Sequence, residues 1–183
     1  SYGLSETLFV STQNPNLKEG LNVGEILNGV QIKNEEGELL INVPWMYLGY
    51  IGANEEDYFI ENYYKSGDIG EIKKGILKIT ERKKDIIIRG GVNISPKKIE
   101  DYLYQKFNFE EISIIGLQDE ILGEKVVCFH TNTTENISII KEDIKELGRD
   151  YNIDEFIKID EMPKNINGKI DKLKLKKWCK SDY

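Results

Sequence analysis

Histidine is nearly absent from this chain of 183 residues, because His130 is its only representative. A histidine-rich metal site and a serine–histidine–aspartate triad are therefore not expected. The two cysteines, Cys128 and Cys179, lie far apart and fit no metal-binding or redox spacing. Cys128 stands in the apolar run VVCF, which predicts a core position. Such cysteine usage suits a reducing compartment, so we expect a cytoplasmic protein.

Long hydrophobic runs and an excess of positive charge are also missing. No apolar run approaches the length of a membrane span, and no signal peptide pattern is present, so no transmembrane segment is expected. The net charge is −7, which argues against nucleic-acid binding through a basic face. Hydrophobic residues make up 39% and charged residues 31%, a composition that indicates an ordinary globular protein.

One lysine stands out in the stretch MPKNINGKID, residues 162–171. Lys169 follows an Asn-Gly turn pair and precedes Asp171, which can cap a last helix. Its ammonium is a compact charge that can reach a phosphate or a carboxylate. The P-loop pattern G-x-x-x-x-G-K-[ST] is excluded, because Pro163 and Ile170 occupy two of its fixed positions. The alternative is a solvated turn lysine in a lysine-rich tail.

Two further stretches carry polar groups that suit a nucleotide. At the N-terminus, Tyr2 offers an aromatic face, Ser5 a hydroxyl, and Glu6 a carboxylate able to hold Mg²⁺ beside phosphate oxygens. A surface turn is the simpler interpretation. In YKSGD, we expect a tight turn at residues 66–68. Asp68 either braces this turn or accepts hydrogen bonds from the vicinal hydroxyls of a ribose.

A domain boundary is predicted at residues 82–85, where four consecutive charges separate two β-like runs. Before it, residues 22–50 and 71–80 show strand patterns. After it we expect a small α/β unit, which starts with a hairpin turn or ligand-approaching bend at Gly90 and Gly91. The predicted elements that follow are a helix capped by Ser95, strands at 111–116 and 125–130, a helix capped by Ser138, a strand at 156–159 and a last helix at 171–179.

The stretches YGLSET, GELLINVPWMYLGY, YKSGD, RKKDIIIRGGVNIS and MPKNINGKID occur in this order along the chain. Together they resemble the C-terminal part of an adenylate-forming (AMP-binding) ligase, a superfamily that includes acyl-CoA synthetases, peptide synthetase adenylation domains and luciferases. The resemblance implies an α+β fold. Residues 1–83 would form the β-rich end of the large domain, and residues 84–183 a small mobile α/β domain that rotates about Lys84.

The resemblance also implies roles for residues of the nucleotide site. Tyr2 would lie against adenine, Ser5 would touch the α-phosphate, and Glu6 would help bind Mg²⁺. Asp68 matches the ribose-binding aspartate, and Arg82 an arginine near the ribose and phosphate.

In the second domain, Lys169 matches the lysine that acts in adenylation, and the loop at Gly90 and Gly91 would line a pantetheine tunnel. This chain departs from the family pattern at three places: Ser66 replaces a threonine, Glu81 a glycine before the arginine, and Val43 a second glycine.

The implied parent is an ATP-dependent carboxylic acid:CoA ligase, which activates a carboxylate as acyl-AMP and transfers it to a thiol. Its substrates would be a carboxylic acid, ATP and CoA, with Mg²⁺ as cofactor. The family's phosphate-gripping loop and most of its acid pocket precede these motifs, so we expect the isolated chain to be incomplete without an N-terminal portion. Two alternatives stay open: an amino-acid adenylation domain that loads carrier-protein pantetheine, and a non-catalytic nucleotide-binding or interaction module.

Overall fold

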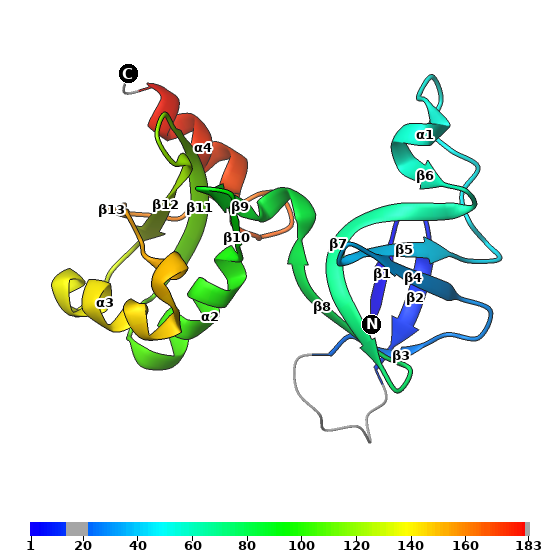
Figure 1. Ribbon diagram of the computed structural model, residues 1–183, viewed down its shortest axis with the longest axis horizontal. Helices are drawn as coiled ribbons and strands as arrows, with labels where there is room; N and C mark the ends of the chain where they lie inside the picture. Colours follow the sequence, from blue (N-terminus) through cyan, green and yellow to red (C-terminus); the bar gives the residue numbers. More distant parts are fainter. Residues whose placement is uncertain (14–21, 182–183) are drawn as a thin grey trace. The chain divides into compact units, whose positions relative to one another are not determined.

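The computed structural model describes residues 1–13 and 22–181, and it divides into two compact units, Ser1–Lys84 and Asp85–Tyr183 (Figure 1). Both units combine sheets with helices, which confirms the predicted α+β class. None of the helices in the described part of the chain has the length and apolar character needed to span a bilayer.

The first unit is built on one antiparallel sheet with the strand order β1-β2-β3-β8-β7-β5-β4, and β6 pairs with β7. Its elements are β1 (Tyr2–Leu4), β2 (Leu8–Thr12), β3 (Gly24–Ile26), β4 (Gln31–Glu35), β5 (Glu38–Asn42), α1 (Glu55–Tyr58), β6 (Phe59–Ile60), β7 (Tyr63–Lys73) and β8 (Ile76–Arg82). The predicted hairpin at 71–80 is present, and it turns at Lys74 and Gly75.

Apolar residues of several strands form the core of this unit. Val10, Leu39, Ile41 and Leu77 are completely buried, and Tyr2 and Leu4 of β1 pack against them. Burying such side chains stabilises a fold by about 1.5–3 kcal/mol each. The core therefore holds β1 against the rest of the sheet, which places Tyr2 beside the centre of β7.

The predicted tight turn at residues 66–68 is wrong, because β7 continues through them without reversing direction. The strand instead carries a bulge: Lys65 pairs with Leu40 of β5, whereas Ile69 pairs with Glu38. Three residues of β7 thus lie opposite one residue of β5, and Gly67 absorbs the distortion with a φ of 68°. The residues whose sequence suggested a turn, 66–68, therefore form a bulge within β7.

The second unit has a mixed sheet with the strand order β10-β9-β12-β11, and β13 pairs with β12 in parallel. A 3₁₀ turn, η1 (Lys83–Asp85), precedes β9. The elements are β9 (Ile87–Arg89), β10 (Val92–Ile94), α2 (Pro96–Lys106), β11 (Ile112–Asp119), β12 (Gly123–His130), α3 (Ile137–Asp143), η2 (Ile144–Leu147), η3 (Arg149–Tyr151), β13 (Glu155–Lys158) and α4 (Lys172–Ser181).

Both faces of this sheet are covered, because its strand residues alternate between two cores. On one face, Ile114 and Cys128 pack with Ile99 and Leu103 of α2 and with Ile140 of α3. Cys128 is fully buried there, as predicted. On the other face, Ile115, Val127 and Phe129 pack with Met162 and Leu175, so α4 covers this side.

The helix caps follow the predictions with one exception. Ser95 caps α2, with its side chain accepting the Lys98 amide at 3.1 Å, and Pro96 is the first helical residue. The cap of α3, however, is Asn136 and not Ser138, because the Asn136 side chain accepts the Ser138 amide at 2.9 Å. Asparagine is as good a cap as serine, and it comes first along the chain.

Candidate nucleotide and acyl-transfer site

Three of the predicted nucleotide-binding residues meet in the first unit. The carboxylate of Asp68 on β7 accepts a hydrogen bond from the Tyr2 hydroxyl through Oδ2 at 2.6 Å. Its other oxygen, Oδ1, pairs with Arg82 Nε on β8 at 2.6 Å. Asp68 is only 2% exposed. Because a carboxylate has about four acceptor positions, these two contacts fix its orientation and leave capacity for hydroxyl donors.

The electrostatics of this cluster follow from burial. Burial raises the pKa of Asp68, and the hydrogen bond from Tyr2 and the charge of Arg82 oppose that rise. Burial, with the bond to Asp68, raises the pKa of Tyr2 well above its ordinary value. Tyr2 therefore remains a protonated donor at neutral pH, and Arg82 keeps the buried carboxylate paired.

The bulge that presents Asp68 is held by its own hydrogen bonds. The Ser66 hydroxyl donates to Leu39 O at 2.6 Å and accepts the Asp68 amide at 3.0 Å. The Gly67 amide donates to Glu38 Oε1 at 3.0 Å. A hydroxyl is thus needed at position 66, which serine supplies as well as threonine would.

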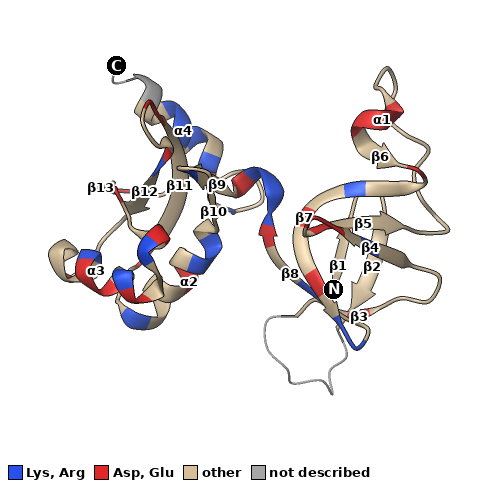
Figure 2. Cartoon of the chain, in the orientation of Figure 1, with Lys and Arg blue, Asp and Glu red and all other residues tan. Residues whose placement is uncertain are grey.

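Glu38 is a residue that the sequence interpretation missed. It is buried, and its second oxygen, Oε2, pairs with Lys83 Nζ at 2.7 Å. One carboxylate therefore connects the bulge at Gly67 with the basic segment Arg82–Lys84, whose charges Figure 2 shows in blue. The available signal was the GEL triplet within GELLIN, which contributed to the family resemblance but was given no role in the site.

Ser5 and Glu6 lie together on the turn between β1 and β2. Ser5 is exposed, whereas Glu6 is half-buried and accepts a hydrogen bond from the Tyr50 hydroxyl through Oε1. That bond raises the pKa of Tyr50. The Tyr47 amide donates to Glu6 O at 3.1 Å, so the turn is also held through its backbone.

The aromatic rings around Glu6 pack on one another. Tyr47 lies 5.1 Å from Tyr50, 5.7 Å from Phe59 and 5.6 Å from Tyr64, measured between ring centroids. Burial raises the pKa of Tyr64, and the nearby charge of Glu6 adds to that rise. Glu6 therefore lies against packed aromatic rings. The hydroxyls of Tyr50 and Tyr64 stay protonated, and the hydrogen bond from Tyr50 orients the Glu6 carboxylate.

Among residues 1–13 and 22–181, no group of three or more histidine, cysteine, aspartate or glutamate side chains is arranged to hold a metal ion. Mg²⁺ is commonly bound through one or two carboxylates together with substrate phosphates. Glu6 therefore fits a magnesium ion that arrives with ATP, and it does not fit a metal held by the protein alone.

Lys169 belongs to the second unit and lies exposed on a loop before α4. Its backbone is fixed on both sides: Lys169 O accepts the Asn165 amide at 2.8 Å, and Lys169 N donates to Asn165 Oδ1 at 3.1 Å. Asp171 caps α4 as predicted, because its side chain accepts the Lys174 amide at 3.0 Å. A rigid backbone thus presents an exposed ammonium.

The other predicted residues lie around the boundary and on a second loop. Lys84 is the last residue of the first unit and lies within η1. Gly90 and Gly91 form the turn between β9 and β10, with φ values of 56° and 82°. This confirms the hairpin interpretation, since two-residue hairpins favour such angles. A role near pantetheine stays a prediction.

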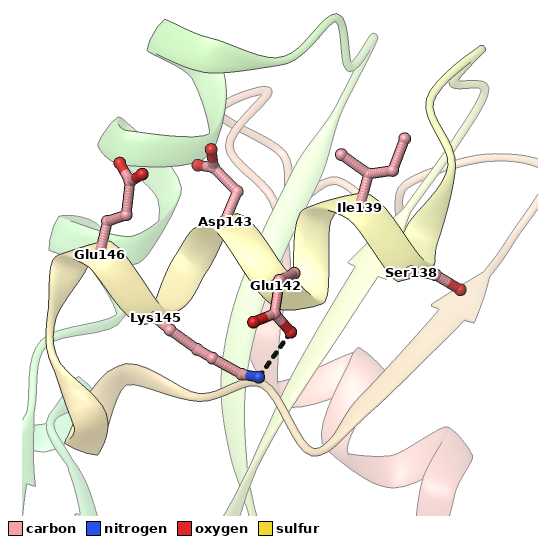
Figure 3. A pocket seen from close by; sticks show the side chains of 6 residues that line it. All are labelled: Ser138, Ile139, Glu142, Asp143, Lys145 and Glu146. Carbon is pink, nitrogen blue, oxygen red and sulfur yellow. Dashed lines mark hydrogen bonds and ion pairs between the residues drawn. The ribbon is translucent and has the colours of Figure 1, made fainter.

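A surface hollow in the second unit holds none of the predicted residues. Figure 3 shows its lining residues from α3 and η2: Ser138, Ile139, Glu142, Asp143, Lys145 and Glu146. Its carboxylates are engaged in ion pairs, since Glu142 pairs with Lys145 and both Asp143 and Glu146 pair with Lys106 of α2. The hollow is a solvated ion-pair surface.

Comparisons with known proteins identify the relatives of this chain. The medium-chain fatty-acid–CoA ligase of Escherichia coli (strain K12) is 32% identical over 152 residues, which cover 78% of this chain and 27% of the relative. The 2-succinylbenzoate–CoA ligase of Listeria monocytogenes serovar 1/2a is 30% identical over 188 residues, covering 96% and 40%. The chain is a relative of the acyl-CoA ligases. No family model matches it.

Solved structures agree with this acyl-CoA ligase relationship. ATP-bound MatB from Rhodopseudomonas palustris shares the fold with a TM-score of 0.89 at 24% identity, covering 100% of this chain and 40% of MatB. The o-succinylbenzoate CoA synthetase MenE from Bacillus subtilis, in complex with its acyl-adenylate intermediate, has a TM-score of 0.74 at 25% identity, covering 85% and 35%. The resemblance to part of an adenylate-forming ligase is confirmed. The chain spans about 25 to 40% of the length of its curated relatives.

Proposed function

We propose that this chain is the C-terminal portion of an ATP-dependent carboxylic acid:CoA ligase. The observation that carries the proposal is the buried Asp68 carboxylate, fixed by Tyr2 and Arg82 with acceptor capacity left for two vicinal hydroxyls. The CoA-ligase relatives and the acyl-adenylate-bound neighbour support the assignment of the parent reaction.

In the first half-reaction, a carboxylate oxygen attacks the α-phosphorus of ATP, the bond to the β-phosphoryl oxygen breaks, and pyrophosphate leaves. The two reactants are both anionic, so repulsion grows as they approach. An ammonium held by a rigid backbone lowers this barrier, and that is the role we assign to Lys169. Asp68 would hold the ribose, with Tyr2 beside adenine and Ser5 at the α-phosphate.

In the second half-reaction, a thiol sulfur attacks the acyl carbon, the acyl–phosphate bond breaks, and AMP leaves while the thiol gives up its proton. We assign Lys84 as the hinge for a change of domain placement between the two steps. Gly90 and Gly91 would then line the path of the pantetheine thiol, because their turn has no side chains to obstruct it. Where bound, Mg²⁺ supplies charge neutralisation to the phosphates, with Glu6 as its protein ligand.

The test is ATP–pyrophosphate exchange by the full-length protein with a panel of carboxylic acids, followed by thioester formation with CoA. We expect exchange with at least one acid and acyl-CoA as the product. The chain alone, without the upstream portion, is expected to show no exchange.

Other outcomes decide between the alternatives. If carrier-protein pantetheine accepts the acyl group and CoA does not, the chain is part of an adenylation domain. If the full-length protein binds ATP and no acid supports exchange, the ligase proposal fails and a binding module takes its place.

A further inference from the structure

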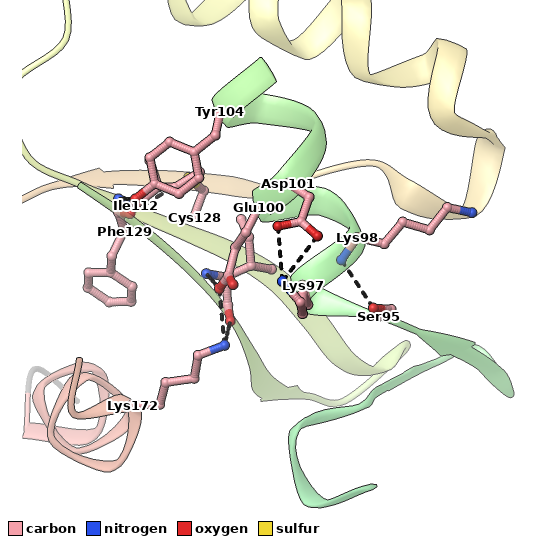
Figure 4. A network of polar contacts seen from close by, with 11 residues as sticks. Ser95, Lys97, Lys98, Glu100, Asp101, Tyr104, Ile112, Cys128, Phe129 and Lys172 are labelled. Carbon is pink, nitrogen blue, oxygen red and sulfur yellow. Dashed lines mark hydrogen bonds and ion pairs between the residues drawn. The ribbon is translucent and has the colours of Figure 1, made fainter. Parts of the chain in front are cut away.

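Side chains cover the outer edge of β11, the last strand in the sheet order of the second unit. An edge strand presents backbone N–H and C=O groups that have no neighbouring strand. Here the Ile112 amide donates to the Tyr104 hydroxyl at 2.9 Å, and the Ile114 amide donates to Glu100 Oε1 at 2.8 Å. Lys172 Nζ donates to Ile114 O at 3.2 Å. Figure 4 shows Tyr104 beside Ile112, and Lys172 beside Glu100.

An ion pair joins the two helices at this edge. Lys172 Nζ lies 3.0 Å from Glu100 Oε1, the same oxygen that accepts the Ile114 amide. The two side chains are 27% and 19% exposed, so water screens the pair only in part. Because Glu100 is on α2 and Lys172 on α4, one ion pair connects helices that pack on opposite faces of the sheet.

The position of Lys172 is unfavourable for a cation by local rules. It is the first residue of α4, and a positive charge near a helix N-terminus is repelled by the helix dipole. The contacts with Glu100 and Ile114 O offset this repulsion. Lys172 therefore stabilises the packing of α4 against α2 and β11, and it does not stabilise the helix α4 itself.

The anchored residue lies three positions after Lys169. The loop that carries Lys169 is closed just before α4, because the Asp171 amide donates to Pro163 O at 2.7 Å. Met162 and Leu175 are buried on the adjacent sheet face. The contacts of Lys172 thus tie the first residue of α4 to β11 and α2 close to the loop that carries Lys169.

We propose that Lys172 is a positioning residue for Lys169, acting through its contacts with Glu100 and Ile114. This inference rests on the proposed function, because it assigns a role that is exerted on the adenylation lysine. Lys172 touches no reacting atom. A displacement of about 1 Å at a reacting group can cost up to about 10²-fold in rate, so a loosened loop base should be visible in the first half-reaction.

The kinetic test uses the full-length protein and measures each half-reaction in single turnovers. Lys172→Met should slow acyl-adenylate formation about tenfold and leave thioester formation from preformed acyl-adenylate within about twofold. Lys172→Arg, which keeps the charge and the donors, should recover most of the rate. Lys174→Met is the matched control, because Lys174 is an exposed lysine of the same helix. Equal losses in both half-reactions would overturn the proposal.

A second readout does not depend on activity. Amide hydrogen exchange of residues 164–170 in the full-length protein should become faster in Lys172→Met and stay unchanged in Lys174→Met. Unchanged exchange in Lys172→Met overturns the positioning role. If the wild-type protein forms no acyl-adenylate, the proposed function fails, and faster loop exchange still supports the anchor.

A third variant guards against misfolding of Lys172→Met. Glu100→Gln keeps an oxygen that can accept the Ile114 amide and removes only the charge that pairs with Lys172. It should give the same pattern with a smaller effect. A folded Glu100→Gln protein with wild-type loop exchange and wild-type adenylation overturns the proposal.

Discussion

The two units of this chain present their candidate functional side chains in opposite ways. In the first unit, Asp68 is buried, and both of its oxygens are engaged by Tyr2 and Arg82. In the second unit, Lys169 is exposed, and only its backbone is fixed. A buried and braced carboxylate suits a permanent recognition site, whereas an exposed ammonium on a rigid loop suits a group that acts in one step and then withdraws. This difference supports the proposal that binding and catalysis are divided between the units.

The largest expected effect concerns Lys169. Lys169→Ala should slow adenylation by roughly 10²–10³, the usual scale for one lost electrostatic donor. Thioester formation from preformed acyl-adenylate should stay nearly unchanged, because the proposed mechanism uses this ammonium in the first step alone. Single-turnover assays of the full-length protein measure both rates.

Lys164→Ala provides the control for that variant. Lys164 lies on the same loop, and the substitution removes its ion pair with the half-buried Glu111, 2.8 Å long. It should behave as wild type in both half-reactions. A large loss in Lys164→Ala would mean that the loop as a whole, and not the ammonium of Lys169, determines the rate.

The next effect concerns Asp68. Asp68→Asn removes the charge that Arg82 pairs with and replaces one acceptor oxygen by an amide donor. Hydrogen bonds to charged groups contribute about 1.5–3 kcal/mol, so ATP affinity should fall roughly 10- to 100-fold. Calorimetric titration of the full-length protein measures this, with Asp101→Asn, a half-buried carboxylate of α2 paired with Lys97, as control. Unchanged affinity would remove Asp68 from the nucleotide site.

The raised pKa of Asp68 gives a pH dependence with a definite sign. Nucleotide hydroxyls need the ionised carboxylate, so affinity should fall as pH decreases, beginning at a pH above that expected for a carboxyl with the ordinary pKa of 3.8. Because the pKa is higher in the folded state, protonation of this group favours folding, and its stabilising contribution is lost as pH rises. Loss of affinity at low pH with an intact fold is therefore the expected result, and titrations at stepped pH values measure it.

The smallest effect tests the bulge. An added Cβ at Gly67 meets only the end of the Arg82 side chain, 4.0 Å away, so Gly67→Ala costs mainly the strain of a φ of 68°, about 1 kcal/mol. Gly75→Ala should cost the same in thermal unfolding, because Gly75 has a φ of 77° and open space around it. Only Gly67→Ala should also weaken ATP binding. Equal affinities for the two variants would show that the bulge does not position Asp68.

Several features of the site were predictable because local chemistry or ordered motifs decide them. The helix after Ser95 and the turn at Gly90 and Gly91 depend on capping and backbone preferences that neighbours cannot easily override. The nearness of Tyr2 to Asp68 followed from the resemblance and not from any pattern of spacing.

The missed features depend on contacts between distant parts of the chain. The bulge at Gly67 arises from the register of β7 against β5, which a turn signal at 66–68 does not reveal. Glu38 and Lys172 are single charged residues whose partners lie 45 and 72 positions away, at Lys83 and Glu100. A local sequence pattern covers only neighbouring residues, so it cannot predict contacts between residues that lie so far apart along the chain.

The most direct test of the divided roles is to measure ATP affinity and ATP–pyrophosphate exchange together in full-length Asp68→Asn and Lys169→Ala. We expect Asp68→Asn to weaken ATP binding, whereas Lys169→Ala should bind ATP within about twofold of wild type and lose exchange by roughly 10²–10³. If both variants lose affinity and exchange in the same proportion, the two units do not divide binding from catalysis.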